Sequence, residues 1–207
     1  MGNEAECTAH FGKKKMTGKA LLETSEILFR PTDGSPRLKI PFSTIKSAKA
    51  VGGELRLHST DGSAIFELGA TADKWCHKIL HPKTRTEKLG LKPGMNVSLI
   101  GEFDSDFGKE LRSITQNIHD GKINSASELI FLSVDSTKAL ATDVDKAAKT
   151  LKGAVALWII YPKGKKQITE NAVLSAGRRA GLKDVKVMGF STTHTALKFV
   201  LPLERRQ

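Results

Sequence analysis

The stretch Lys88-Leu-Gly-Leu-Lys-Pro-Gly-Met-Asn-Val-Ser-Leu-Ile-Gly101 divides the sequence into two patterns. Before it, short segments alternate apolar and polar residues and are separated by turn dipeptides such as Gly52-Gly53 and Asp61-Gly62, which is typical of β-hairpins. After it, apolar strand-like segments alternate with helical ones. The stretch therefore predicts a boundary between a domain over residues 1–88 and a domain over residues 89–207, and residues 96–101 are expected to form the first strand of the second domain.

The first domain is predicted to be an α+β domain, a small β-barrel or meander that ends in one helix. Period-two alternation marks five half-buried strands, over residues 20–24, 26–30, 37–42, 54–59 and 63–68. A helix is expected over about residues 71–82, where Trp75 and Ile79 share one face and Pro82 ends the helix. This layout, across residues 5–82, resembles a pleckstrin-homology-like domain.

The second domain is predicted to be α/β, with a short, mainly parallel sheet and a terminal antiparallel hairpin. Strands are expected over residues 128–134, 154–161, 184–190 and 195–201. Helices are expected over about residues 106–118, 136–151 and 169–180. The segment 119–127 is short and rich in turn residues, so a strand-helix-strand piece that larger folds of this kind contain is expected to be missing.

Four segments of this domain resemble a known fold family. They are Leu89-Gly-Leu-Lys-Pro-Gly94, Leu157-Trp-Ile-Ile-Tyr-Pro-Lys163, Ala180-Gly-Leu-Lys-Asp-Val-Lys-Val187 and Ala196-Leu-Lys-Phe-Val200. In this order they resemble a reduced Rossmann-like, methyltransferase-like fold, and an uncharacterised bacterial family (a domain of unknown function) that has it. The resemblance implies a fold without an established activity.

The turn after the first strand of this domain is acidic. A Rossmann-like cofactor site needs glycines there, because they let the backbone approach the ligand closely. The turn Gly101-Glu-Phe-Asp-Ser-Asp-Phe-Gly108 has glycine only at its ends, and its carboxylates would repel a pyrophosphate. S-adenosylmethionine, which has a sulfonium and an amine, is less opposed. The candidate cleft consists of Gly101, Glu102, Phe103, Asp104, Asp135 and Ser136, and no cofactor is expected.

The formal net charge is +11 and the isoelectric point is about 9.7. Such a balance favours anionic partners. Residues 1–88 contribute +5 and residues 89–207 contribute +6, so the excess is spread evenly. The candidates for anion contacts are two lysine clusters, Lys13, Lys14 and Lys15 in the first domain and Lys163, Lys165 and Lys166 in the second.

Metal and thiol chemistry have little support in the sequence. Cys7 and Cys76 lie far apart and form no Cys-x-x-Cys pair. His77 and His81 are four residues apart on one expected helix, but no third ligand lies near them. We therefore expect no metal site and name no catalytic residue. No secretory signal and no apolar run of membrane-spanning length is present, so a cytoplasmic location without a transmembrane segment is expected.

The sequence leaves three functions open. The first is a non-catalytic binding or interaction protein for an anionic ligand or a protein partner. The second is an S-adenosylmethionine-dependent, methyltransferase-like enzyme that uses the cleft described above. The third is weak binding of nucleic acid or an anionic membrane through basic loops, although aromatic residues are only 6% of the chain and lie mostly within apolar strands. The first is preferred here, so enzymatic activity is not expected.

Overall fold

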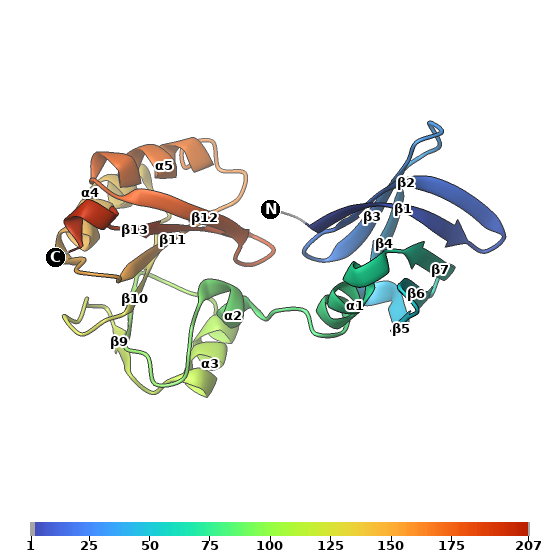
Figure 1. Cartoon of the computed structure of the whole chain (residues 1–207). Coiled ribbons are helices and arrows are strands. Elements are labelled where there is room, and N and C mark those ends of the chain that lie inside the picture. The colour runs from blue at the N-terminus through green and yellow to red at the C-terminus, as the bar shows by residue number, and fades with distance from the viewer. Residues whose placement is uncertain (1–2, 207) are drawn as a thin grey trace. The chain divides into compact units, whose positions relative to one another are not determined.

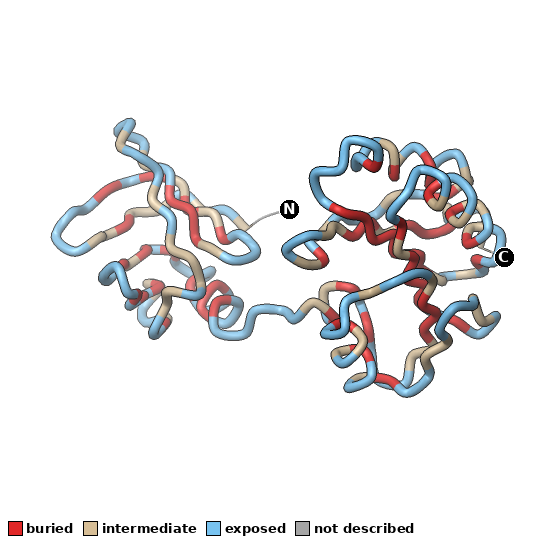
Figure 2. The backbone as a smooth tube through the Cα atoms, turned by 180° about the vertical axis from the view of Figure 1, so that it is seen from behind, coloured by how far each residue is buried: buried red, intermediate tan, exposed pale blue. Residues whose placement is uncertain are grey.

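The chain folds into two compact units that divide between Lys83 and Thr84. The structure is a computed structural model and describes residues 3–206. The division precedes the expected boundary by five residues because helix α2 (Arg85–Leu89) belongs to the second unit, where Leu89 is fully buried in a core. Buried residues follow the strands of each unit (Figure 2). Among the described residues, no helix combines the length and the hydropathy needed to cross a membrane.

The first unit is a curled antiparallel sheet with one helix (Figure 1). Its strand order is β4-β3-β2-β1-β7-β6-β5, and helix α1 (Ala72–Leu80) packs against β5 and β6. The strands are β1 (Asn3–Phe11), β2 (Lys14–Leu22), β3 (Glu26–Pro31), β4 (Leu38–Pro41), β5 (Ile45–Val51), β6 (Glu54–Ser59) and β7 (Gly62–Glu67). The prediction of a β-rich unit with one closing helix is therefore confirmed.

The core of this unit explains why these residues form strands. Inward positions alternate along β6, where Leu55 and Leu57 are buried, and α1 adds Trp75. The rings of Phe29 and Phe66 pack edge to face, with centroids 6.0 Å apart. Strand β1 was missed in the sequence because its inward positions Ala5, Cys7 and Ala9 are small and only Phe11, at its end, is large, which gives a weak apolar signal. The prediction that the first strand begins near residue 20 is wrong.

The second unit is a mixed six-stranded sheet covered on both faces. Its strand order is β12-β13-β11-β10-β8-β9, in which β9, β8, β10 and β11 run parallel and β13 runs antiparallel to both neighbours. The strands are β8 (Val97–Ile100), β9 (Ile118–Asp120), β10 (Leu129–Ser133), β11 (Ala156–Pro162), β12 (Lys183–Gly189) and β13 (His194–Val200). All seven residues of β11 are buried, as a central strand covered on both faces requires.

The helices of this unit lie on opposite faces of the sheet. Helices α4 (Thr137–Thr150) and α5 (Glu170–Arg179) share one core with the strands, while α2 and α3 (Ser105–Ile114) share the other (Figure 1). Asp104, Ser136 and Thr169 each begin a helix, because each side chain accepts a hydrogen bond from the backbone three residues on. The ring of Phe199 occupies the space that a Cβ at Gly177 would need, so glycine brings α5 close to the sheet there.

One sequence expectation for this unit is wrong. Residues 106–118 were expected to be helical and 119–127 to be turn, but α3 ends at Ile114 and the chain then forms β9, parallel to β8. The helix stops early because the hydroxyl of Thr115 donates to the carbonyl of Met95, which lies before β8. Val97 then donates to the carbonyl of Asn117 and starts the pairing. The strand after the first helix is therefore present, and the chain runs from it directly to β10 through residues 121–128.

Candidate functional site

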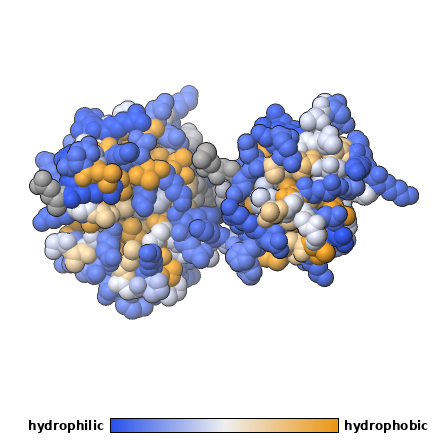
Figure 3. Space-filling model, in the orientation of Figure 1, coloured by the Kyte–Doolittle hydropathy of each residue, from blue (hydrophilic) through white to orange (hydrophobic). Residues whose placement is uncertain are grey.

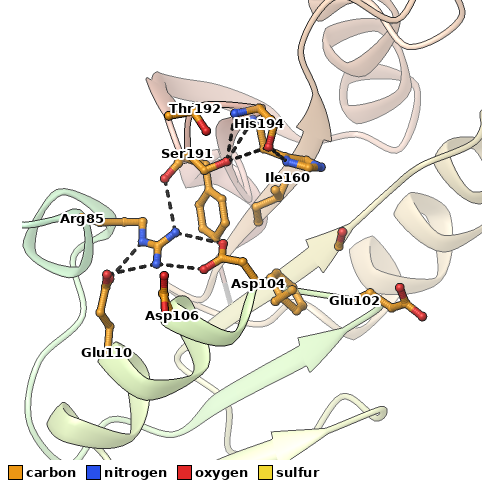
Figure 4. A pocket seen from close by; sticks show the side chains of 13 residues that line it. Arg85, Glu102, Asp104, Asp106, Glu110, Ile160, Ser191, Thr192 and His194 are labelled. Carbon is orange, nitrogen blue, oxygen red and sulfur yellow. Dashed lines mark hydrogen bonds and ion pairs between the residues drawn. The ribbon is translucent and has the colours of Figure 1, made fainter.

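A cavity of about 410 Å³ opens at the carboxyl edge of this sheet (Figure 4). Its floor includes Ser133 at the end of β10 and Ile160 in β11, and one wall is the segment Glu102–Asp104 between β8 and α3. The opposite wall is the turn Ser191–His194 between β12 and β13. Because β13 runs antiparallel to β11, its first residue reaches the same edge at which the parallel strands end.

The cavity lies at the place where the topology of the sheet reverses. From β8 the chain crosses through α3 to β9, which lies on one side of β8. Strand β10 lies on the other side of β8, and from it the chain continues through α4 to β11, farther away from β8. The crossovers therefore lie on opposite faces, and the loops after β8 and β10 diverge. Ligands of open α/β sheets bind in the crevice that such a divergence creates.

Gly101 allows the loops after β8 and β10 to approach each other. It has a φ of +89°, and a Cβ added to it would lie 2.7 Å from the carbonyl oxygen of Ser133. A side chain at this position would strain the backbone and push against the end of β10. Gly101 therefore has the property expected of a glycine at a cofactor loop, although the loop has no further glycine before Gly108.

A guanidinium spans one wall of the cavity. Arg85, in α2, donates to both carboxylate oxygens of Asp104 (3.0 and 3.2 Å) and to both of Glu110 (2.9 and 3.0 Å). Its Cζ atom lies 5.1 Å from the ring centre of Phe107 and 4.8 Å from that of Phe190. These contacts tie together α2, α3 and the end of the β12–β13 hairpin, so we call this group the Arg85 clamp.

The clamp favours the ionised form of Asp104. Partial burial by itself would raise the pKa of Asp104, but hydrogen bonds from Arg85 and from the amide of Phe107 outweigh it and lower the pKa. Burial likewise opposes the charge of Arg85, yet its hydrogen bonds to Glu110 and Asp104 raise its pKa. Asp104 is thus ionised and neutralised, whereas Glu102 and Asp106 remain exposed at the mouth of the cavity.

The cleft candidates from the sequence divide into two groups. Glu102, Phe103 and Asp104 line the cavity, and Gly101 shapes it from behind. Asp135 and Ser136 are exposed and do not line the cavity, because β10 already ends at Ser133 and Ser136 caps α4.

The lysine candidates lie away from the floor of the cavity. Lys163 donates to the carbonyls of Ser191 (2.6 Å) and Thr192 (3.3 Å), so it holds the turn that forms one wall. Lys165 and Lys166 are exposed on the loop before α5 and border a separate open depression. The other three, Lys13, Lys14 and Lys15, are exposed at the β1–β2 hairpin of the first unit.

The sequence analysis missed several residues that matter here. Arg85 follows the capping box formed by Thr84 and Glu87, a Thr-x-x-Glu pattern that predicts a helix start. His194 lines the cavity, and its Nδ1 lies 2.9 Å from the hydroxyl oxygen of Thr193. Asp120 ends β9, twenty residues after the last residue of β8. Its position was hidden because a three-residue strand gives no periodic signal.

Cysteine and histidine pairs show no further site. The rings of His77 and His81 lie 4.7 Å apart on and just after α1. Among residues 3–206, no group of three or more histidine, cysteine or acidic side chains could hold a metal ion. Burial raises the pKa of both thiols, for Cys7 to about 11, which makes them poor nucleophiles.

Comparison with known proteins finds methyltransferases among the solved structures that are similar to the chain. No protein-family model and no curated protein matches it. Among solved structures, it is similar to a fibrillarin from Aeropyrum pernix with natively bound S-adenosyl-L-methionine, at 13% identity and a TM-score of 0.38, over 97% of this chain and 100% of that one.

Two further similarities are of the same kind. One is to human N-acetylserotonin methyltransferase in complex with SAM, at 10% identity and a TM-score of 0.43, over 63% of this chain and 55% of that one. The other is to a putative type 11 methyltransferase from Sulfolobus solfataricus, at 9% identity and a TM-score of 0.42, over 56% of this chain and 88% of that one. This chain thus spans about half the length of the human enzyme.

These findings correct the preferred functional interpretation. The chain was expected to be a non-catalytic binding or interaction protein, but several of the solved structures that it resembles are described as methyltransferases or hold S-adenosyl-L-methionine. They favour the alternative, a methyltransferase-like enzyme. At these identities and TM-scores the likeness concerns the fold alone, so the chemistry must be inferred from the cleft.

Proposed function

We propose that the second unit is a reduced Rossmann-like domain that acts as an S-adenosylmethionine-dependent methyltransferase. The observation that supports this most is the cavity at the point where the strand order reverses between β8 and β10. In open α/β folds this crevice is where cofactors bind. Four parallel strands, two helices on one face and two on the other are enough to build it.

The charge of the cleft suits S-adenosylmethionine better than a dinucleotide. Asp104 occupies the amino end of α3 and accepts from the Phe107 amide at 2.7 Å, so a phosphate would meet a carboxylate there instead of free N–H groups. Glu102 and Asp106 add negative charge at the same mouth. A sulfonium and an ammonium group are attracted by such a wall, whereas a pyrophosphate is repelled.

Asp120 supplies the acidic residue that a nucleoside cofactor requires. In Rossmann-like sites an Asp or Glu about 20 residues after the first strand, at the end of the second, accepts hydrogen bonds from the ribose hydroxyls. Asp120 has this place in β9 and is exposed. Its neighbour in the sheet, Leu99, accepts a hydrogen bond from Gly121, which fixes the end of the strand. Asp120 does not line the cavity itself, so the proposal requires the ribose to extend from the cavity to the end of β9.

The cofactor would supply a methyl group on a positively charged sulfur. The chain must then position an acceptor and remove its proton. His194 is the cavity residue suited to the second task, because its Nδ1 bonds the Thr193 hydroxyl and its Nε2 is the other proton site of the ring. Ser133 and Ser191 border the same space with polar groups that can orient an acceptor.

Calorimetric titration of the whole chain with S-adenosylmethionine and S-adenosylhomocysteine tests this proposal. We expect micromolar binding of either compound and a loss of about tenfold or more in Asp120→Asn, because one charge-assisted hydrogen bond is worth about 1.5–3 kcal/mol. Asp73→Asn, at an exposed carboxylate of α1 in the first unit, is the matched control and should bind as the parent does. No binding of either compound, or equal weakening in both variants, refutes the assignment.

For the first unit we propose a pleckstrin-homology-like domain whose β1–β2 hairpin contacts anions. Support comes from its seven antiparallel strands with one helix after the last strand, and from the exposed Lys13, Lys14 and Lys15 in one hairpin. Lysine contacts phosphate as a point charge. Sedimentation with vesicles that contain an anionic lipid tests it: recovery should exceed that with neutral vesicles and fall when the three lysines become alanine. Equal recovery with both vesicles contradicts it.

A further inference from the structure

One edge of the second unit's sheet is open. Strand β12 is the last in the strand order and pairs only with β13 among the described strands. Its outer side presents backbone N–H and C=O groups that a further strand can pair with. The opposite edge is β9, which is only three residues long, so β12, with seven residues, is the better template for strand addition.

Exposed apolar side chains lie on this edge strand and in the short helix that follows β13. Val185 and Val187, both in β12, are 56% and 48% exposed, and Leu203, in the 3-10 helix η3 (Leu203–Arg205), is 76% exposed. Only two other large hydrophobic residues in the described chain, Val51 and Leu80, are exposed to a similar degree. Figure 3 shows that hydrophilic residues cover most of the visible surface of each unit, with groups of hydrophobic residues between them. Clustered exposed apolar residues on a monomer indicate a contact surface.

The same edge is basic. Residues 178–206 contain seven lysines and arginines but only two acidic residues, a net charge of +5 out of +11 for the whole protein. Arg179, Lys183 and Lys186 are exposed in or just before β12. Arg205 donates to the carbonyl of Gly181 at 2.9 Å, which holds η3 and its positive charge beside the start of the strand.

These features indicate which kind of strand can pair with β12. Lysines and a β-bulge on an edge strand prevent unwanted pairing, and β12 has both, with a register shift between Asp184 and Lys186. A second copy of β12 would bring like charges opposite each other, which is destabilising. An acidic strand meets no such penalty, and its apolar side chains would cover the two valines.

We propose that β12 is the docking edge for an acidic, extended segment of a partner protein, which adds to the sheet as a seventh strand. Backbone hydrogen bonds supply affinity, alternate apolar side chains cover Val185 and Val187, and acidic side chains meet the basic residues. The surface is separate from the cleft and is independent of the methyltransferase proposal. It gives the chain a means of association with a partner protein that the cavity itself does not provide.

Fluorescence polarisation of a labelled peptide with alternating glutamate and valine, about eight residues long to match the strand, tests this on the full chain. A second peptide has the same side chains but N-methyl groups on alternate amides, which removes its backbone donors. We expect the first peptide to bind, and N-methylation to weaken binding by about tenfold or more, since several hydrogen bonds of about 1 kcal/mol each are lost.

Variants locate the site. The pair Arg179→Glu and Lys183→Glu should weaken peptide binding by about tenfold, while Lys149→Glu with Lys152→Glu, exposed at the end of α4 and just beyond it, should leave it unchanged. Hydrogen exchange should show new protection of β12 amides with the peptide present. Three results would each overturn the proposal. The first two are equal binding of the N-methylated peptide and an equal loss of affinity in the two double variants. The third is displacement of the peptide by single-stranded DNA of the same charge that binds more tightly than the peptide, which would indicate a nucleic-acid surface.

Discussion

Removal of the Arg85 guanidinium should destabilise the second unit by about 2–3 kcal/mol. The side chain is only 15% exposed and makes four hydrogen bonds to carboxylates, each of a kind worth about 1.5–3 kcal/mol. Most of that sum is offset by the desolvation of the guanidinium in the folded state. The two stacking contacts with Phe107 and Phe190 add about 0.5–1 kcal/mol each.

The carboxylates limit the loss. Asp104 and Glu110 are 41% and 43% exposed, so both can recover water once Arg85 is gone. For this reason the loss of stability in Arg85→Met should be smaller than the roughly 3–5 kcal/mol that is typical when a fully buried ion pair is broken. Arg85→Lys should lose about 1–2 kcal/mol, because an ammonium retains the charge but not the planar fork or the stacking.

Tryptophan fluorescence can report each unit separately. The chain has two tryptophans, Trp75 in the first unit and Trp158 in the second, and both are buried. In a Trp75→Phe background, Trp158 alone reports the second unit, and its Nε1 donates to the carbonyl of Leu89 at the end of the helix that bears Arg85. Urea unfolding then gives the free energy of unfolding of that unit.

A matched control separates the clamp from an ordinary surface pair. Arg56 pairs with Glu54 at 2.8 Å but is 54% exposed, and Arg56→Met should cost less than about 1 kcal/mol. If Arg85→Met costs no more than Arg56→Met, each measured with the tryptophan of its own unit, the clamp does not stabilise the fold.

The pH dependence of the stability is a second check on the clamp. Because the pKa of Asp104 is lowered by folding, its stabilising effect is complete above its unfolded pKa and is lost as pH falls through the folded one. In Arg85→Met, the free energy of unfolding should therefore fall less steeply as the pH is lowered.

Three further outcomes are expected. Gly101→Ala should cost about 2–3 kcal/mol, because it combines a positive φ with a close approach to Ser133, whereas Gly121→Ala, with a φ of +74° and open space around it, should cost about 1 kcal/mol in the same unfolding assay. The only tyrosine, Tyr161, should ionise with a pKa of about 12, because burial and then the charge and hydrogen bond of Glu170 oppose the tyrosinate, so stability should fall as pH rises from the unfolded value of about 10. An absorbance titration that finds the ordinary pKa would show that Tyr161 is solvated. Cys7, with a pKa near 11, should react with iodoacetamide at neutral pH more slowly than an ordinary thiol and faster once the chain is unfolded, which denaturant-dependent labelling measures.

The sequence predicts the architecture well where residues bury large apolar side chains at a regular period. The strands around Leu55 and Trp158, and the helix with Leu140 and Val144, have this pattern. Strand β1 lacks it because its inward positions before Phe11 are small, and β9 lacks it because three residues show no period. Local composition cannot reveal either strand, since both are held mainly by pairing with a neighbour.

The cleft was predictable only on one side. Glu102, Phe103 and Asp104 follow the first strand directly in sequence, so the order of elements places them. Arg85, Phe190 and His194 reach the cavity from segments that are about 100 residues apart, and no local pattern joins them. The acidic loop also looked more negative in the sequence than it is, because the guanidinium that neutralises Asp104 comes from outside the loop.

The direct passage from β9 to β10 has a consequence for protein engineering. Within it Asn124 and Ser127 are bonded to the buried hydroxyl of Ser98, but Gly121 and Lys122 are exposed. New sequence spliced between Gly121 and Lys122 would emerge at the rim of the sheet without disturbing either core, within reach of the proposed ribose anchor. A fluorescent reporter grafted there would turn occupancy of the neighbouring crevice into an optical signal.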